Sequence, residues 1–262
     1  MLTFVKLGGS LITDKQQPKA FRQPVMDRIA AEIAAALTKS PDLRLLIGNG
    51  SGSFGHVTAR KYDTMTGVQT PEQWRGFAEV ATVASEIGQL VANSLLAAGV
   101  AAWRLQPSAS ALAHDGRIIN MALSPVRDAL EHGLVPLVHG DVSLDNVRGG
   151  TIISTETIFF YIAQHFPVDN VLLLGEVPGV YDTSGRIIRY ITPGNLPEVE
   201  AALGGSAGTD VTGGMETKVR DMVALVEAQP QMTIRIMDGR EPGLLQATLL
   251  GQAEPRTVIQ AD

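Results

Sequence analysis

The sequence contains no cysteine among its 262 residues. This absence excludes disulfides, thiolate nucleophiles and cysteine-ligated zinc. Aromatic residues make up only 5% of the chain against 45% apolar residues, so we expect a core built mainly from Ala, Leu, Val and Ile. The N-terminal stretch MLTFVKLGG has an early lysine and no long apolar run. Neither a signal peptide nor a membrane span is predicted, and a cytoplasmic protein is therefore expected.

Positive charge is also in short supply. The formal net charge is −6 and no long basic run occurs, which argues against nucleic-acid binding. If the substrates are anions, they must be attracted by a few local cations and by backbone N–H groups. Individual lysines near glycine-rich turns are therefore the first candidates for function, and the chain has 27 glycines from which to build such turns.

Apolar runs and helical patterns alternate along the chain. Short continuous apolar runs are typical of buried parallel strands, and patterns with a period of 3.6 residues are typical of helices that cover them. We therefore predict a mainly parallel sheet with helices on both faces, in a single domain over residues 1–262 without repeats or linkers. The expected strands are 5–7, 43–48, 100–105, 134–141, 169–175, 232–239 and 256–260, hairpins are expected over 142–154 and around 184–188, and the expected helices are 25–37, 71–99, 124–133, 155–166, 213–229 and 241–251.

The stretch GSGSFG at residues 50–55 matches G-x-G-x-x-G. A dinucleotide-binding fold would need an acidic residue about 20 positions later at the end of a strand, but position 70 is Thr and no strand is predicted there. The HRD and DFG motifs of protein kinases and the Walker A motif are missing as well. Two interpretations remain: an ordinary strand-to-helix turn, or a turn whose bare N–H groups face an anion.

Cationic side chains accompany the glycine-rich turns. Lys6 precedes Gly8-Gly9-Ser10, Lys15 follows that turn, and His56 directly follows the second turn. Lys218 lies one turn inside a helix that opens with two glycines, where a cation is disfavoured unless an anion is bound. Because parallel strands end at the same edge of a sheet, we expect two anion-binding turns side by side.

Together, KLGGSLITDK, the stretch ending in SFGH, VHGDV, EVPGVYD and DVTGGMETK resemble the amino acid kinase superfamily over nearly the whole chain. KLGGS and TGGM..K are general to the superfamily, whereas LITDK and GSFGH are similar to the isopentenyl phosphate kinases within it. The resemblance implies an open αβα sandwich, a homodimer, and transfer of the γ-phosphoryl group of ATP, with Mg²⁺, to isopentenyl phosphate. Alternatives are a related kinase acting on another small phosphate, a phosphonate such as fosfomycin or a carboxylate, or a non-catalytic nucleotide-binding storage or sensor module.

The resemblance also implies residue roles. The N-terminal part would bind the acceptor phosphate and the C-terminal part the nucleotide, with no metal held by protein side chains. The implied catalytic residues are Lys6, Lys15, His56 and Lys218. The implied ATP-binding residues are Lys6, Gly8, Gly9, Ser10, Gly52, Glu176, Gly179, Tyr181, Gly214 and Lys218. The implied acceptor-binding residues are Gly50, Ser51, Gly55, His56 and Thr155, and Glu156 would orient the lysines.

Several positions depart from the pattern of the resembled family. Asn49 replaces a His, Ser51 and Thr155 replace Gly, and Glu156 and Glu176 stand where Asp is usual. These changes bear on the choice of acceptor more than on phosphoryl transfer, which needs alignment and positive charge. The apolar helix over residues 77–96 is expected to provide a wall for the acceptor's hydrocarbon tail or, alternatively, to be a plain core helix. Asp141 and Asp145 are either turn formers or further site residues.

Overall fold

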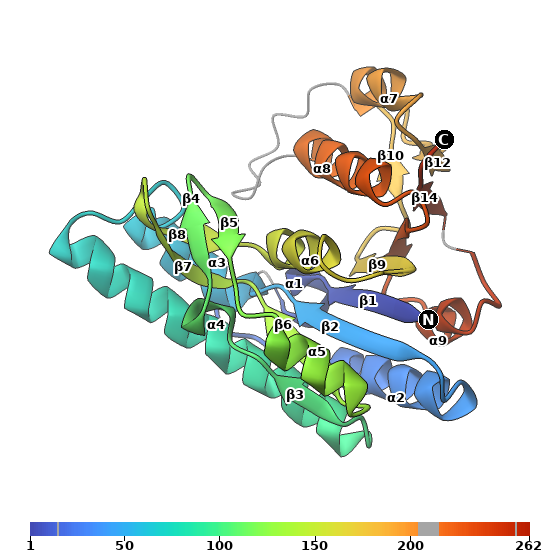
Figure 1. Ribbon diagram of the computed structural model, residues 1–262, viewed down its shortest axis with the longest axis horizontal. Coiled ribbons are helices and arrows are strands. Elements are labelled where there is room, and N and C mark those ends of the chain that lie inside the picture. The colour runs from blue at the N-terminus through green and yellow to red at the C-terminus, as the bar shows by residue number, and fades with distance from the viewer. Residues whose placement is uncertain (15, 204–214, 255) are drawn as a thin grey trace.

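The computed structural model describes residues 1–14, 16–203, 215–254 and 256–262, and Figure 1 shows their arrangement. The centre is an eight-stranded sheet with the order β12-β14-β13-β9-β1-β2-β6-β3. Every neighbouring pair is parallel except β13 and β14, which confirms the predicted mainly parallel sheet. The strands are β1 (Leu2–Leu7), β2 (Arg44–Asn49), β3 (Ala102–Arg104), β6 (Val135–His139), β9 (Asn170–Gly175), β12 (Tyr190–Ile191), β13 (Thr233–Asp238) and β14 (Thr257–Ile259).

Helices cover both faces of this sheet, which makes an αβα sandwich, as expected (Figure 1). One face carries α2 (Gln23–Lys39), α4 (Pro71–Ala97) and α9 (Leu244–Leu249), and the other carries α5 (Ser124–Glu131), α6 (Thr155–Ala163) and α8 (Met215–Ala228). In chain order a further helix, α7 (Leu196–Leu203), lies between α6 and α8, and it contacts α8.

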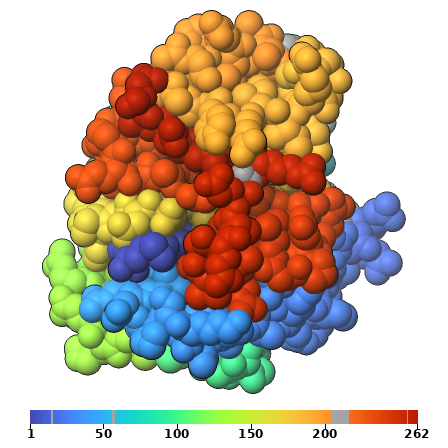
Figure 2. All heavy atoms as spheres, turned by 90° about the vertical axis from the view of Figure 1, so that its right-hand side faces the viewer, coloured from blue at the N-terminus to red at the C-terminus, as the bar shows by residue number. Residues whose placement is uncertain are grey.

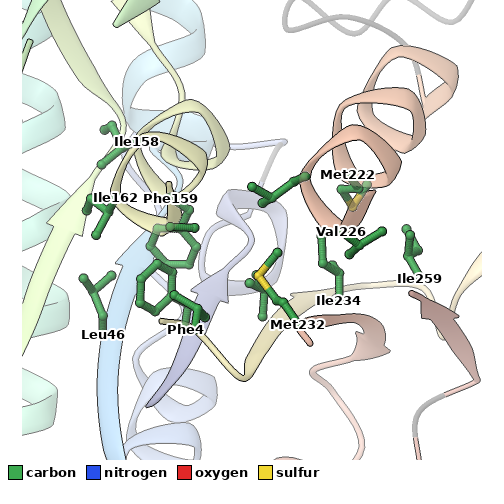
Figure 3. Packing of buried hydrophobic residues seen from close by; sticks show 14 of the residues in the cluster. Phe4, Leu46, Ile158, Phe159, Ile162, Met222, Val226, Met232, Ile234 and Ile259 are labelled. Carbon is green, nitrogen blue, oxygen red and sulfur yellow. The ribbon is translucent and has the colours of Figure 1, made fainter. Parts of the chain in front are cut away.

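Side chains alternate between two hydrophobic cores, one on each face of the sheet. On β1, Phe4 belongs to the core beneath α6 and α8, whereas Val5 belongs to the core beneath α2 and α4. Figure 3 shows the first of these cores, in which Phe4 packs edge-to-face on Phe159 of α6 with 5.1 Å between ring centroids. The period of two along a strand therefore places Lys6 on the same face as Phe4, toward α6.

A smaller four-stranded sheet stands beside the main one, with the order β5-β4-β7-β8. The hairpin of β7 (Asp141–Asp145) and β8 (Gly149–Ile153) was predicted, but β4 (Leu112–His114) and β5 (Arg117–Asn120) were not. The hairpin expected around 184–188 is also present, as β10 (Val180–Tyr181) paired with β11 (Ile187–Ile188).

Asp145 closes two turns of this smaller sheet and is a structural residue. Its buried carboxylate accepts hydrogen bonds from the backbone N–H groups of Asp115, Gly116, Val147 and Arg148, at 2.7 to 3.1 Å. Burial alone would raise the pKa of Asp145, but the four N–H donors outweigh that effect and hold the pKa at about 2.

The long helix α4 is a core helix. Its length and composition would allow it to cross a membrane, but half of its most apolar window is buried inside the fold. Val83, Ile87 and Val91 lie in the core on the α2 side of the sheet. Thr70 and Gln73 form a capping box at its start, which sets the helix boundary.

The starts of two helices add detail that the sequence did not give. The stretch Gly8-Gly9-Ser10 was expected to be a turn, but Gly9–Ile12 forms the short helix α1. The helix predicted over 155–166 is α6, and Ser154 is its N-cap, with a hydroxyl that accepts from the N–H of Thr157 at 3.0 Å. Because Ser154 caps the helix, the hydroxyl of Thr155 is free for a different partner.

Candidate active site

A cavity of about 350 Å³ opens at the carboxyl ends of β1, β2, β6 and β9. In sheets of this kind, ligands bind at that edge. The cavity brings together most of the residues predicted for function that the structure describes. Those that line it are Lys6, Gly8, Gly9, Ser10, Gly50, Ser51, Gly52, Gly55, Thr155, Glu156 and Lys218.

The two glycine-rich turns touch each other at the floor of the cavity. A Cβ on Gly9 would lie 2.6 Å from the Cα of Gly52, and a Cβ on Gly50 would lie 3.0 Å from the N of Gly9. Gly52 has φ of +49°, in the left-handed region that favours glycine. The first turn opens α1 and the second opens α3 (Gly52–Tyr62), and first-turn N–H groups have no partner inside their helix. The expected pair of adjacent turns is therefore present.

Lys6 and Glu156 form an ion pair inside the cavity. The Lys6 Nζ donates to Oε1 of Glu156 at 2.5 Å, and the side chains are only 18% and 20% exposed. Burial alone would raise the pKa of the Glu156 carboxyl. The attraction and hydrogen bond of Lys6, the backbone N–H of Glu156 and the charge of Lys218 outweigh burial, so the pKa falls below its usual range. Glu156 is thus a carboxylate at neutral pH and holds the ammonium of Lys6 in place.

Lys218 reaches the same place from the other side of the cavity. It lies in the first turns of α8, beside Thr217, and lines the cavity with it. Its positive charge is felt by Glu156, so two lysines from distant parts of the chain converge near one carboxylate. Lys15 and Gly214 lie outside the described residues, as does the side chain of His56.

Thr155 has a structural bond in addition to its place in the cavity wall. Its buried hydroxyl donates to the backbone carbonyl of Asn49 at 2.8 Å and so ties the start of α6 to the end of β2. The side chain of Ser51 packs against Gly55, where a Cβ would lie only 2.7 Å from the Cβ of Ser51. Ser51 therefore occupies space that a side chain at position 55 would need. Both departures from the resembled pattern therefore lie in the turn region itself.

Three residues expected near the nucleotide do not line the cavity: Glu176, Gly179 and Tyr181. Glu176 accepts from Nη1 of Arg22 at 2.8 Å, and the same nitrogen donates to the carbonyl of Ser10 at 3.1 Å. Arg22 was not singled out in the sequence, where it precedes the proline of α2 without any motif. It links the first glycine turn to the loop after β9.

Gly179 and Tyr181 lie in the segment that leads into β10. A Cβ on Gly179 would lie 2.9 Å from Ile187, so this position is filled by packing. Tyr181 is 41% exposed and pairs with Ile187 in the small hairpin.

A buried polar group under the cavity was missed as well. His139 is 1% exposed and contacts the Gly140 carbonyl through Nδ1 at 3.1 Å and Arg104 through Nε2 at 3.4 Å. Burial lowers the pKa of His139, and Arg104 adds to this effect against the opposing influence of Asp141 and Gly140. The neighbouring Asp141 lines the cavity and accepts from the N–H of Ser108 at 3.1 Å. The VHGDV stretch was the signal for both residues.

An apolar wall continues the cavity away from the glycine turns. Val80 and Ala84 of α4 line it, together with Ala59, Met65 and Ile152. Two positions of the helix predicted over residues 77–96 therefore line the cavity, and a wall for the acceptor's tail stays a prediction. The rest of the helix's apolar face, including Ile87 and Val91, packs in the core.

Comparisons with known proteins agree with this architecture. The amino acid kinase family matches residues 1–238. Isopentenyl phosphate kinase of Methanothermobacter thermautotrophicus is 35% identical over 96% of this chain and 96% of its own length. The enzyme of the same name from Methanocaldococcus jannaschii is 30% identical over 97% of both chains. Among solved structures, an isopentenyl phosphate kinase superposes with a TM-score of 0.84 at 31% identity, over 99% of this chain and 100% of that one.

Proposed function

The chain belongs to the amino acid kinase family, and we propose from that membership and from the cavity that it is an isopentenyl phosphate kinase. It transfers the γ-phosphoryl group of ATP to isopentenyl phosphate and forms isopentenyl diphosphate and ADP. The observation that carries the proposal is the convergence of Lys6, Glu156, Lys218 and two touching glycine turns in one cavity. Near full-length similarity to enzymes of that name supports the choice of acceptor.

The chemistry requires two anions to meet end to end. Two unit charges at about 4 Å repel by about 4 kcal/mol at an effective dielectric near 20. Lys6 and Lys218 place positive charge where the transferring group would carry its negative charge. A general base is unnecessary, because a phosphate with a second pKa of about 6 is already ionised at neutral pH. The cavity accordingly presents lysine side chains and glycine turns to the two phosphates, and its carboxylate Glu156 orients Lys6.

Mg²⁺ is proposed as the partner of the nucleotide. In the described residues, no group of three or more His, Asp or Glu side chains is arranged to hold a metal. The lysines and backbone N–H groups that line the cavity suit phosphate oxygens, and the ion would be held by the phosphates of ATP, where it would neutralise charge on the nucleotide. In the first glycine turn, Gly9 and Ser10 would hold the nucleotide phosphates by their N–H groups, while the N–H of Gly8 donates to the Leu174 carbonyl at 2.8 Å and fixes the turn against β9. Lys15 and Gly214 are assigned to the same side by resemblance.

The acceptor is proposed to lie along the second turn, with Gly50, Ser51, Gly55 and Thr155 around its phosphate, while Gly52 faces the nucleotide. His56 would donate to that phosphate, as the resemblance implies. The hydrocarbon tail would then run along the wall of Val80, Ala84 and Met65, which removes apolar surface from water. Glu176, Gly179 and Tyr181 are retained as nucleotide-side residues, acting from the loop after β9.

The experiment that tests this function is an ADP-release assay with one acceptor at a time. The panel contains isopentenyl phosphate, dimethylallyl phosphate, fosfomycin and acetylglutamate, each with ATP and Mg²⁺. We expect the largest kcat/KM with isopentenyl phosphate. A preference for fosfomycin would assign the chain to the phosphonate kinases, and a preference for acetylglutamate would contradict a phosphate acceptor. ATP binding without ADP release from any acceptor would indicate a nucleotide-binding sensor.

We further propose a single functional domain over residues 1–262, a homodimer and a cytoplasmic location, on the strength of the resemblance. Sedimentation equilibrium at several protein concentrations measures the assembly directly, and a mass of one chain at all concentrations would contradict the dimer.

A further inference from the structure

A second hollow, of about 550 Å³, lies at the opposite edge of the central sheet. Its residues come from the amino ends of β1, β9 and β13 and from the last turns of α2 and α9. In Figure 1 the N-terminus lies beside α9 on this side, and Figure 2 views the same side of the molecule, with the N-terminal part of the chain in dark blue. Strands rise about 3.3 Å per residue, so β1 separates Thr3 from the active-site turn at Gly8 by about 17 Å.

The charge of this hollow differs from that of the protein as a whole. Its twelve lining residues include Lys39 and Arg235 and no Asp or Glu. Acidic residues outnumber basic ones in the whole chain, which has a net charge of −6, whereas the lining of this hollow has two basic side chains and no acidic one. Lys39 also lies in the last turn of α2, where a cation stabilises the helix by itself. The argument for a ligand therefore depends on Arg235.

Arg235 is a half-buried guanidinium with few partners. It pairs in register with Leu172 of β9 and lies on the face covered by α2 and α9. Its Nε donates one long bond, 3.5 Å, to the hydroxyl of Thr233. Among residues 1–14, 16–203, 215–254 and 256–262, no carboxylate oxygen lies within 4.0 Å of it. A guanidinium has five N–H donors in a planar fork, so Arg235, which lines the hollow, has donors left for a ligand there.

Thr3 adds a second polar group at the floor. The registers of β1, β9 and β13 place Thr3, Asn170 and Thr233 in one row across the sheet. Thr233 donates to the Asn170 amide oxygen at 2.8 Å. Thr3 lines the hollow, is 2% exposed, and its hydroxyl has no hydrogen-bond partner in the described structure. A buried hydroxyl without a hydrogen-bond partner costs free energy, and Val would fill the same place in the strand without that cost. A Thr at this position is therefore unusual unless its hydroxyl binds something.

We propose that this hollow is a binding site for a small oxyanion, a phosphate or a carboxylate. Arg235 makes charge-assisted hydrogen bonds to the anion, Thr3 donates from the floor, and Lys39 contributes charge at the rim. Leu250, which is partly exposed and also lines the hollow, offers an apolar surface for a short hydrocarbon arm beside the anionic group. The site shares no residue with the active-site cavity and is independent of the proposed function.

Isothermal titration calorimetry with inorganic phosphate tests the proposal on the whole protein. The comparison is between the natural chain, Arg235→Gln, and the matched control Arg44→Gln. Arg44 is an exposed arginine at the same edge of the sheet, at the start of β2, and it does not line the hollow. Any phosphate bound in the active site contributes equally to all of them. We expect Arg235→Gln to weaken one phosphate site by at least about tenfold and Arg44→Gln to leave it unchanged.

Two further arms sharpen the result. Thr3→Val keeps the shape of the side chain, so it should weaken phosphate binding severalfold without lowering the midpoint of thermal unfolding. This variant also carries the test if Arg235→Gln does not fold. Replacing phosphate by acetate or by butyl phosphate identifies the preferred oxyanion and shows whether an apolar arm adds affinity. The proposal is overturned if the isotherms of Arg235→Gln and Thr3→Val match that of the natural chain, or if Arg44→Gln loses as much binding as Arg235→Gln.

Discussion

Lys6 provides the sharpest test of the active site, because its charge and its partner are both known. Lys6→Met removes the ammonium but keeps most of the volume of the side chain. A unit charge about 4 Å from the transferring group contributes about 4 kcal/mol at an effective dielectric near 20. This amount corresponds to about a thousandfold in rate, at 1.36 kcal/mol per factor of ten. Little discounting for solvent is needed, since the Lys6 side chain is only 18% exposed. We therefore expect kcat/KM to fall by about a thousandfold.

The partner of Lys6 supplies an internal control. Lys6→Met leaves the Glu156 carboxylate in the cavity without the ammonium that now neutralises it at 2.5 Å. That carboxylate would repel both phosphates, so the double variant Lys6→Met/Glu156→Gln should be about tenfold more active than Lys6→Met alone. The assay is steady-state ADP release with isopentenyl phosphate, with thermal unfolding as the check on folding. A folded Lys6→Met enzyme with less than a fivefold loss, or a double variant less active than the single one, would refute the reasoning.

Three other predictions concern residues around the same fold. Asp145→Asn should cost about 2 kcal/mol, because a pKa of about 2 against an ordinary 3.8 represents that much stabilisation above pH 4. The pKa is depressed, so the difference between the two proteins in urea unfolding should shrink as pH falls from about 4 to 2, and a difference independent of pH would contradict the assignment. Arg22→Gln and Glu176→Gln should each raise the KM for ATP severalfold with a smaller effect on kcat, because each breaks the same 2.8 Å ion pair. The double variant should have a KM for ATP no higher than that of either single variant, and additive increases in KM would mean that the pair does not act as a unit. His56→Ala should raise the KM for the phosphate acceptor strongly while the Kd for ATP, measured by calorimetry, changes little, and a reversed pattern would move His56 to the nucleotide side.

The sequence was informative where the physics is local. A continuous apolar run predicts a buried parallel strand, and β2 and β9 lie within a residue of their expected bounds. The contact of the two glycine turns also followed from the sequence, because neighbouring parallel strands deliver their carboxyl ends to one edge. Lys6 could be oriented in the same way, since the period of two along β1 places it on the side of α6.

What could not be predicted depends on contacts between distant segments. Arg22 and Glu176 are 154 positions apart, and although Glu176 opens the EVPGVYD stretch, no pattern around Arg22 showed that the two would pair. A role for Asp145 as a turn former was one of the two alternatives, but its four N–H donors come from two separate turns, and the distant turn at Asp115 and Gly116 could not be linked to it from the sequence. The strands β4 and β5 are short and are joined through a register shift, which conceals the alternation that would have revealed them.

The contact between Gly9 and Gly52 has a consequence for how this enzyme can diverge. The spacing of the two glycine turns is set by this contact between main chains, and the hydroxyl of Thr13 reinforces it by donating to the Gly9 carbonyl at 2.7 Å and accepting from the N–H of Ser53 at 3.0 Å. Substitutions in the cavity wall near Val80 and Ala84 can thus change which acceptor fits, while the spacing of the two turns stays constant. A change in the spacing of the two turns would instead require both loops to move together.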